Sequence, residues 1–411
     1  SMLAWLIGFG AVWVLGTRGP GLWALALASA FPLALHLLIM LAAWTGLLGQ
    51  PIPTFLTFQE VASRLRDLFS AKVAWTAPQA LPLPFWGVED MHGNLGYAAG
   101  QAIALLCVLL LMGWRERKPL QFMVSAVVIA LCLVSLLLAS SRGGVLYAVI
   151  LVLIAMLIYR LRLSCTGVAS VTGRVSAYVW IALLGVAVLV AGLAWRVAST
   201  DLRWQTMLDK VQIGLSQADP IRVLCEGLSP AQEQQIRQIY SYRAPAYVDE
   251  LIAGLKGQDG GRILLMRAGI ELALENPRGQ DGSRGSYQKL IEKKCGHVPE
   301  LTFAHLHQSW MDLALGLGWL GAGLFAWLLL SFVRAGWRTI GPGDAGAWGF
   351  ALLLIASFWF MRGFADSIYR EHYLQMQAVL MAYLYSRIFL TRLSIVPLVA
   401  GDNRFKQKDI S

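Results

Sequence analysis

Uninterrupted apolar stretches recur along the chain, and short charged segments separate them. A helix needs about 20 apolar residues to cross the hydrocarbon layer of a bilayer. The predicted spans are Leu3 to Leu15, Leu22 to Leu48, Leu95 to Trp114, Leu120 to Ala139, Val145 to Tyr159, Ala177 to Trp195, Met311 to Val333, Ala345 to Met361 and Tyr373 to Leu390. This pattern predicts an all-α fold, a polytopic transmembrane helical bundle with nine spans as a minimum.

Composition separates one segment from the rest. Hydrophobic residues make up 57% of the 411 residues and charged residues 14%, which excludes an ordinary water-soluble globule with its roughly 25% of charged residues. Within residues 196–304, however, about a quarter of the residues are charged, as in a soluble domain. We therefore expect N-terminal spans at 1–195 with a loop at 50–92, a large, mainly helical domain at 196–304, C-terminal spans at 305–392 and a tail at 393–411.

The distribution of charge predicts which side each part faces. The net charge is +10, and the basic excess lies beside the spans, where the positive-inside bias marks the cytoplasm. Alternation then puts the loop at 50–92, the turn at 140–144, the domain at 196–304 and the turn at 362–370 on the outer side, and the tail in the cytoplasm. Apolar positions on one side of Glu60 to Val73 predict an interfacial helix in the first outer loop.

The cysteines and acidic residues suggest few metal or redox sites. Cys225 and Cys295 share the outer domain, so an oxidising compartment would permit a disulfide between them, and two unrelated thiols are the alternative. No common metal-binding motif occurs. Glu89, Asp90 and His92 are the nearest metal-like cluster, and three adjacent polar loop residues are more often solvated than ligating.

Three cations, Arg142, Arg362 and Arg370, lie at the predicted outer rim, against the charge bias. Arg142 sits among small residues in the turn at 140–144, where backbone N–H groups and a guanidinium can approach an anion together. Arg362 ends a span on the same side. Each cation either snorkels to lipid headgroups or holds an anionic ligand near the outer leaflet.

A histidine opens the first span after the outer domain. His307 lies at its predicted outer mouth and His305 two residues earlier. An imidazole there can accept a proton from an attacking hydroxyl or donate a hydrogen bond to a phosphate. The alternative is a tolerated amphipathic residue. Upstream, Gly261 to Gly279 predicts an amphipathic helix, in which Arg262 and Arg267 need not share a ligand because their spacing places them on different sides.

Three segments together resemble the O-antigen ligase and polymerase superfamily of bacterial envelope glycosyltransferases. His307-Gln308, nine residues and Gly318-x-x-Gly321 meet one family pattern, a helix from Arg262 to a turn with Pro277, Gly279 and Gly282 is similar to a second, and Ser141-Arg142-Gly143 is similar to a third. Gly316 stands where many relatives carry an acidic residue, and the glycine after Pro277 comes one position early. One large outer loop resembles the ligases more than the polymerases.

The resemblance implies a GT-C type bundle in the bacterial inner membrane, multi-pass, with 196–304 as a periplasmic domain and an active site facing the periplasm. It implies an inverting, metal-independent glycosyltransferase that moves a glycan from undecaprenyl pyrophosphate to a hydroxyl of lipid A-core oligosaccharide in lipopolysaccharide biosynthesis. The implied partners are this donor, this acceptor and membrane lipids. Neither a cofactor nor a nucleic acid is expected.

The roles of individual residues follow from the same resemblance. Without a metal ion, arginines must stabilise the leaving pyrophosphate, and Arg142 and Arg262 are the first candidates, with Arg267 third. His307 is either the general base or a group that positions the donor phosphate, and both roles stay open. The candidates for substrate binding are Arg267, Gln308, His305, Arg362 and Asn94.

Two other functions remain as alternatives. An O-antigen polymerase of the same superfamily would lengthen the lipid-linked glycan instead of placing it on the core. A lipid or glycan transporter would carry charged or broken helices near the bilayer midplane. The interiors of the predicted spans hold few charges, which argues against an ion-coupled carrier.

Overall fold

A computed structural model of the chain describes residues 2–15, 19–48, 55–70, 87–88, 91–139, 141–163, 192, 195, 199, 202–256, 258–283, 285–369 and 371–393. The elements of the first half are α1 (Met2–Leu15), α2 (Leu22–Trp44), β1 (Phe55–Leu56), α3 (Phe58–Phe69), β2 (Gly87–Val88), α4 (Met91–Arg115), α5 (Pro119–Leu138), α6 (Arg142–Ile158) and the π-helical turn η2 (Tyr159–Leu163). Those of the second half are α8 (Leu202–Gln205), α9 (Met207–Ser216), α10 (Pro220–Glu226), α11 (Pro230–Ile239), α12 (Pro245–Lys256), α13 (Gln258–Glu275), α14 (Ser286–Cys295), α15 (Ser309–Thr339), α16 (Asp344–Arg362) and α17 (Glu371–Leu393).

The predicted all-α class is confirmed. Among the described residues the only strands are β1 and β2, of two residues each, which pair in parallel. Six helices in the described part of the chain are long and apolar enough to cross a membrane. They comprise Leu22–Trp44, Asn94–Arg115, Pro119–Leu138, Gly143–Arg162, Ser309–Thr339 and Asp344–Arg362. The chain is therefore a polytopic membrane protein.

The other three predicted spans have different outcomes. Leu3 to Leu15 forms α1, which is apolar but short. Tyr373 to Leu390 lies in α17, which carries Gln375, Gln377 and Arg387 among its apolar residues and is not one of the six. Ala177 to Trp195 lies outside the described residues apart from Gly192 and Trp195. The number of spans and the side each loop faces stay predictions.

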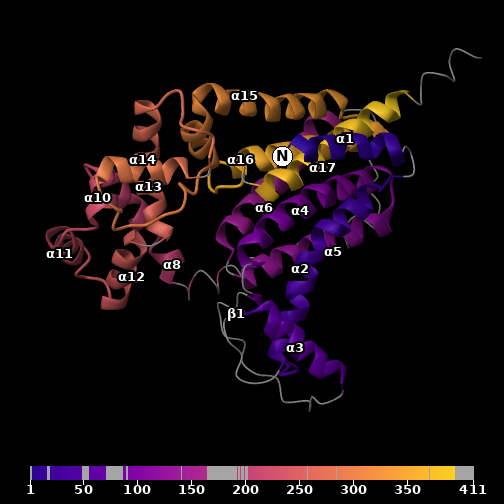
Figure 1. Cartoon of the computed structure of the whole chain (residues 1–411). Coiled ribbons are helices and arrows are strands. Elements are labelled where there is room, and N and C mark those ends of the chain that lie inside the picture. The colour runs from indigo at the N-terminus through magenta and orange to yellow at the C-terminus, as the bar shows by residue number, and fades with distance from the viewer. Residues whose placement is uncertain are drawn as a thin grey trace, which may run out of the picture. The chain divides into compact units, whose positions relative to one another are not determined.

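The chain divides into two compact units. The first comprises residues 1–193, 330–359 and 375–411, and the second comprises residues 194–329 and 360–374. In the first unit α4 is the central helix, because it contacts α2, α5 and α6 (Figure 1) and most of it is buried. Gly100 of α4 lets α16 approach closely, since a Cβ there would lie 2.2 Å from the ring of Phe358.

The second unit is a cluster of short helices around α13 (Figure 1). Apolar positions three and four residues apart on α12 and α13, among them Leu251, Leu255, Leu264 and Leu265, are fully buried and form the centre of its core. Two of the surrounding helices, α10 and α11, have a proline at their first position and a side-chain cap before it. Asp219 caps α10, and Ser229 forms a capping box with Gln232 at α11.

The helix α15 is broken at Gly318, whose φ of 74° and ψ of 173° are not helical. The residues after the break, roughly 20 of them, are by themselves enough to cross a bilayer. The residues before it belong to the second unit. This unit therefore extends beyond the predicted domain boundary at 304 and includes the start of α15 and the segment 360–374.

The turn after α13 satisfies the backbone groups that the break exposes. The N–H groups of Gln280 and Gly282 donate to the carbonyls of Leu315 and Gly316, and that of Trp319 donates to the carbonyl of Pro277, all at 2.9 to 3.1 Å. A Cβ on Gly318 would lie 2.6 Å from the backbone of Arg278, so the contact requires glycine. The turn with Pro277, Gly279 and Gly282 and the segment that begins at Gly318, two motifs far apart in the sequence, are thus in direct contact.

Candidate functional site

His307 lies in the second unit, two residues before α15. Its φ of +53° is in the left-handed region, where a residue other than glycine is uncommon. Its backbone N–H donates to Nδ1 of His305 at 3.2 Å, and the two rings lie 4.1 Å apart. The edge of the ring of Phe303 faces the imidazole at 6.4 Å. The side chain is 14% exposed, so the imidazole lies in a largely enclosed, aromatic environment.

A carboxylate and a guanidinium lie beside this imidazole. Oδ1 of Asp366 is 3.9 Å from Nδ1 of His307, and Oδ2 of Asp366 accepts from Nη2 of Arg362 at 3.3 Å. The Arg362 side chain is buried. A carboxylate in this position favours the tautomer with the proton on Nδ1 and stabilises an imidazolium. The separation is longer than a hydrogen bond, as it often is in enzymes without a bound substrate.

Ser309, the first residue of α15, fixes the turn that carries Asp366. Its hydroxyl donates to the carbonyl of Asp366 at 2.7 Å and accepts from the N–H groups of Ile368 at 2.6 Å and Tyr369 at 3.2 Å. The hydroxyl of Ser367 donates to Asp312, one turn into α15. These bonds hold the carboxylate in place relative to the start of the helix.

Gln308 caps α15. Its side chain is buried, and its Oε1 accepts the N–H of Met311 at 2.6 Å. A side-chain oxygen that accepts an N–H of the first turn satisfies one of the unpaired donors at the start of a helix. The structure thus gives Gln308 a capping role at the start of α15, beside the candidate site.

Arg262 lies on α13, on the side that faces the histidine segment. A Cβ on the preceding Gly261 would lie 2.8 Å from the ring of Phe303, and one on Gly269 would lie 2.7 Å from Leu306. Arg262 and Gly269 are seven residues apart, two helical turns, and therefore share a face. Nε of Arg262 is buried and has no hydrogen-bond partner among the described residues. A cation of this kind is available to a ligand.

Arg267 has a different role from the one the sequence suggested. Its Nη1 donates to the carbonyls of Gly214, Leu215 and Gln217 at 3.1, 3.0 and 2.5 Å. These carbonyls end α9, where a cation also interacts favourably with the helix dipole. The guanidinium thus joins α13 to α9, and we do not include it in the candidate site.

One further polar group is buried near the start of α15. The Tyr287 hydroxyl has no hydrogen-bond partner in the described part of the chain. Burial, and after it the charge of Asp312, raises the pKa of Tyr287 above its ordinary value. The phenol therefore stays neutral and can donate a hydrogen bond.

The other candidate residues lie in the first unit or outside the described residues. Arg142 is the first residue of α6, and Asn94 lies in the first turn of α4. Glu89 and Asp90 lie outside the described residues, and His92 begins α4. The described residues contain no group of three or more potential metal ligands.

A disulfide joins Cys225 at the end of α10 to Cys295 at the end of α14, with 5.5 Å between the Cα atoms. It closes a loop of 70 residues that contains α13. A disulfide that closes a loop of this length stabilises a domain by several kcal/mol, because it lowers the conformational entropy of the unfolded chain. The bond therefore helps to keep α13 and the histidine segment in a fixed arrangement.

The sequence did not reveal Asp366 or Phe303 as members of the site. Asp366 lies in the turn after α16, outside every motif, and Phe303 lies in an irregular segment. The available signal was the spacing of Arg362 and Asp366, because cation and carboxylate four residues apart at the end of a helix often form an ion pair. Phe303 gives no comparable signal.

Long apolar helices, a separate helical unit and a histidine, carboxylate and arginine cluster define the class: a polytopic helical membrane protein with a candidate active site in that unit. Residues 127–326 match the family model described as O-Antigen ligase. This match covers just under half of the chain and supports its assignment to the O-antigen ligase family, whose activity is of the O-antigen ligase or polymerase type in lipopolysaccharide biosynthesis at the bacterial inner membrane. A search of curated proteins finds no match.

Proposed function

We propose that this protein is an O-antigen ligase that transfers a glycan from undecaprenyl pyrophosphate to a hydroxyl of lipid A-core oligosaccharide at the periplasmic face of the membrane. The observation that carries the proposal is the enclosed row of His307, Asp366 and Arg362 beside the face of α13 that holds Arg262. It combines a base with a cation, the two groups that such a transfer needs.

His307 is the general base of the proposed reaction. The acceptor hydroxyl loses its proton to the imidazole while its oxygen forms a bond to the anomeric carbon of the donor sugar. Asp366 stabilises the imidazolium that results, and the ion pair with Arg362 holds Asp366 beside it. The acceptor oxygen attacks the anomeric carbon directly, with no glycosyl-enzyme intermediate, so this single displacement inverts the anomeric configuration.

Arg262 stabilises the leaving group. The bond between the anomeric carbon and the phosphate oxygen breaks as the new bond forms, and its electron pair leaves with the pyrophosphate. A guanidinium binds phosphate oxygens through two parallel hydrogen bonds, and the partnerless, buried Nε of Arg262 supports this assignment. Since arginine carries the charge in this proposal, the donor needs no divalent cation, and EDTA should leave the transfer rate unchanged.

A transfer assay with purified protein, lipid-linked donor and lipid A-core acceptor tests the proposal. We expect His307→Ala to lower kcat by roughly 10² to 10⁴, the contribution of a positioned general base. Arg222→Ala, which removes an exposed ion pair on α10, is the control and should transfer at the parent rate. Lengthening of the lipid-linked glycan with none on the core would instead identify a polymerase, and near-parent transfer by folded His307→Ala would refute the role of the histidine.

A further inference from the structure

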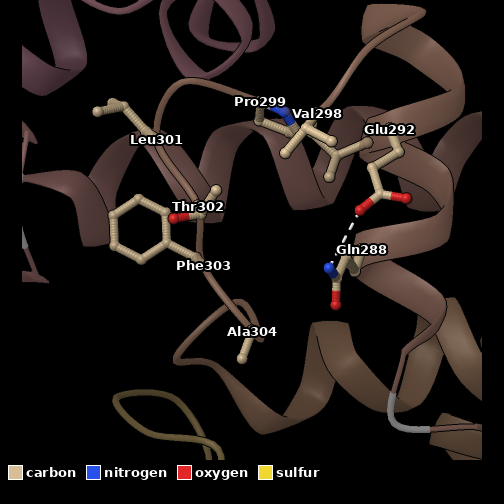
Figure 2. Close-up of a pocket in the computed structure, with 9 residues that line it drawn as sticks. Gln288, Glu292, Val298, Pro299, Leu301, Thr302, Phe303 and Ala304 are labelled. Carbon is tan, nitrogen blue, oxygen red and sulfur yellow. Dashed lines mark hydrogen bonds between the residues drawn. The ribbon is translucent and has the colours of Figure 1, made fainter.

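The second unit contains a cavity of about 270 Å³ that the catalytic proposal does not use. Helix α14 forms one wall through Gln288, Ile291 and Glu292, and the segment 298–304 forms the other (Figure 2). The volume lies just below the roughly 300 to 1,000 Å³ of sites for drug-sized ligands. It suits a single ring with its substituents better than an extended chain.

The walls combine apolar and polar groups. Phe303 and Leu301 are apolar, and Val298 is 68% exposed although it is a large aliphatic residue. On the α14 wall, Nε2 of Gln288 donates to Oε1 of Glu292 at 3.0 Å (Figure 2). An amide offers donors and an acceptor, and a carboxylate offers acceptors. Such walls fit a ligand with an apolar face and an edge of neighbouring hydroxyls, which is the chemistry of a pyranose ring.

Both walls are held in place before any ligand binds. The N–H groups of Glu300 and Leu301 donate to the carbonyls of Cys225 and Leu224 at 3.0 and 3.1 Å. The disulfide from Cys225 to Cys295 ties the end of α14 to the same helix, α10. A site whose walls are fixed loses less entropy when a ligand binds.

Phe303 connects the cavity to the candidate active site. Phe303 is one of the residues that line the cavity, and its ring is perpendicular to the imidazole of His307, with 6.4 Å between the two ring centroids. A sugar in the cavity would therefore be a neighbour of the sugar whose hydroxyl or anomeric carbon reacts.

We infer that this cavity is a carbohydrate subsite that seats one pyranose ring of a glycan substrate next to the reacting sugar. The inference rests on the proposed function. The ring belongs either to the core oligosaccharide of the acceptor or to the glycan of the donor, which present the same chemistry to these walls.

Binding measured without turnover tests the inference and separates the two sources. The full-length protein carries His307→Ala, and its affinity is measured by titration with two probes, delipidated core oligosaccharide and O-antigen oligosaccharide released from its lipid. We expect Gln288→Ala and Glu292→Ala to weaken binding of one of these probes at least tenfold. Both side chains lie at the surface of α14, so the fold should persist, and Gln238→Ala on α11 is the matched control. Thr302→Trp, which fills the cavity, should weaken binding of the same probe.

The probe that is affected identifies the source of the ring. Unchanged affinity of both probes for all three cavity variants would overturn the inference, and so would the absence of binding of either probe to the parent. The proposed function fails separately, if the wild-type protein places no glycan on the core in the transfer assay, whatever the binding experiment shows.

Discussion

The backbone of His307 is held in a conformation that its side chain does not favour. Its φ of +53° costs roughly 1 to 2 kcal/mol for a residue with a Cβ. The bond from its N–H to His305 and the caps at the start of α15 hold it there. Strain of this kind is found at functional sites, where the position of a side chain matters more than local stability.

This strain predicts that glycine and alanine at position 307 differ in their effect on stability. His307→Gly should be more stable than His307→Ala by about 1 kcal/mol, because glycine adopts positive φ without the steric penalty of a Cβ. Both variants should lack transfer activity. Chemical denaturation of the two variants measures the difference, and equal stabilities would show that the backbone at this position is not strained.

Asp366 should act through the imidazole and not on the substrate. We expect Asp366→Asn to lower kcat by up to roughly 10⁴-fold, the effect of losing the carboxylate that orients a catalytic histidine, with KM for both substrates unchanged. Steady-state kinetics with each substrate varied in turn provide the measurement. A rise in KM with an unchanged kcat would assign Asp366 to substrate binding instead.

At the scale of elements, the glycines of the histidine motif have a role that packing between membrane helices would not suggest. Small residues within membrane helices usually allow neighbouring helices to pack closely. In the structure Gly318 is instead the position where α15 breaks and meets the turn at Pro277, Gly279 and Gly282. Sequence could pair these motifs by resemblance, but a hydrogen-bonded contact between a turn and a broken helix leaves no periodic pattern to read.

Two glycines of α15 provide a matched test of this contact. Gly318→Ala should destabilise the protein by at least 1 kcal/mol, because it adds a Cβ at positive φ and places it against the backbone of Arg278. Gly323→Ala meets no atom within 4 Å and should be neutral or stabilising by up to about 1 kcal/mol. Thermal unfolding of the purified proteins compares them, and equal effects would contradict a break at Gly318.

At the scale of the whole molecule, the sequence predicted the fold class and the long apolar helices, and it did not identify every residue of the site. Apolar length and charge density were enough for the all-α class, the spans that became α2, α4 and α16, and a separate unit rich in charge. The second unit also includes the start of α15, an apolar segment that belongs to a candidate membrane span. Apolar length and charge density could not identify Asp366 as a site residue, because only the folded chain brings it close to His307.

The candidate residues are distributed over both units. Arg262, His305, His307 and Arg362 belong to the second unit, and their neighbours in that unit can be described directly. Arg142 begins α6 in the first unit. Its part in binding the pyrophosphate therefore stays a prediction from the sequence.

The central claim is that His307 and Arg262 serve one chemical step, and a double-mutant cycle on kcat tests it most directly. We expect Arg262→Ala to lower kcat by roughly 10² to 10³, as for the loss of one donor to a developing negative charge. The effects of substituting residues that act in the same step are strongly non-additive. The double variant His307→Ala/Arg262→Ala should therefore be hardly slower than the slower of the two single variants. Effects that multiply in full, or wild-type transfer by folded Arg262→Ala, would contradict the account.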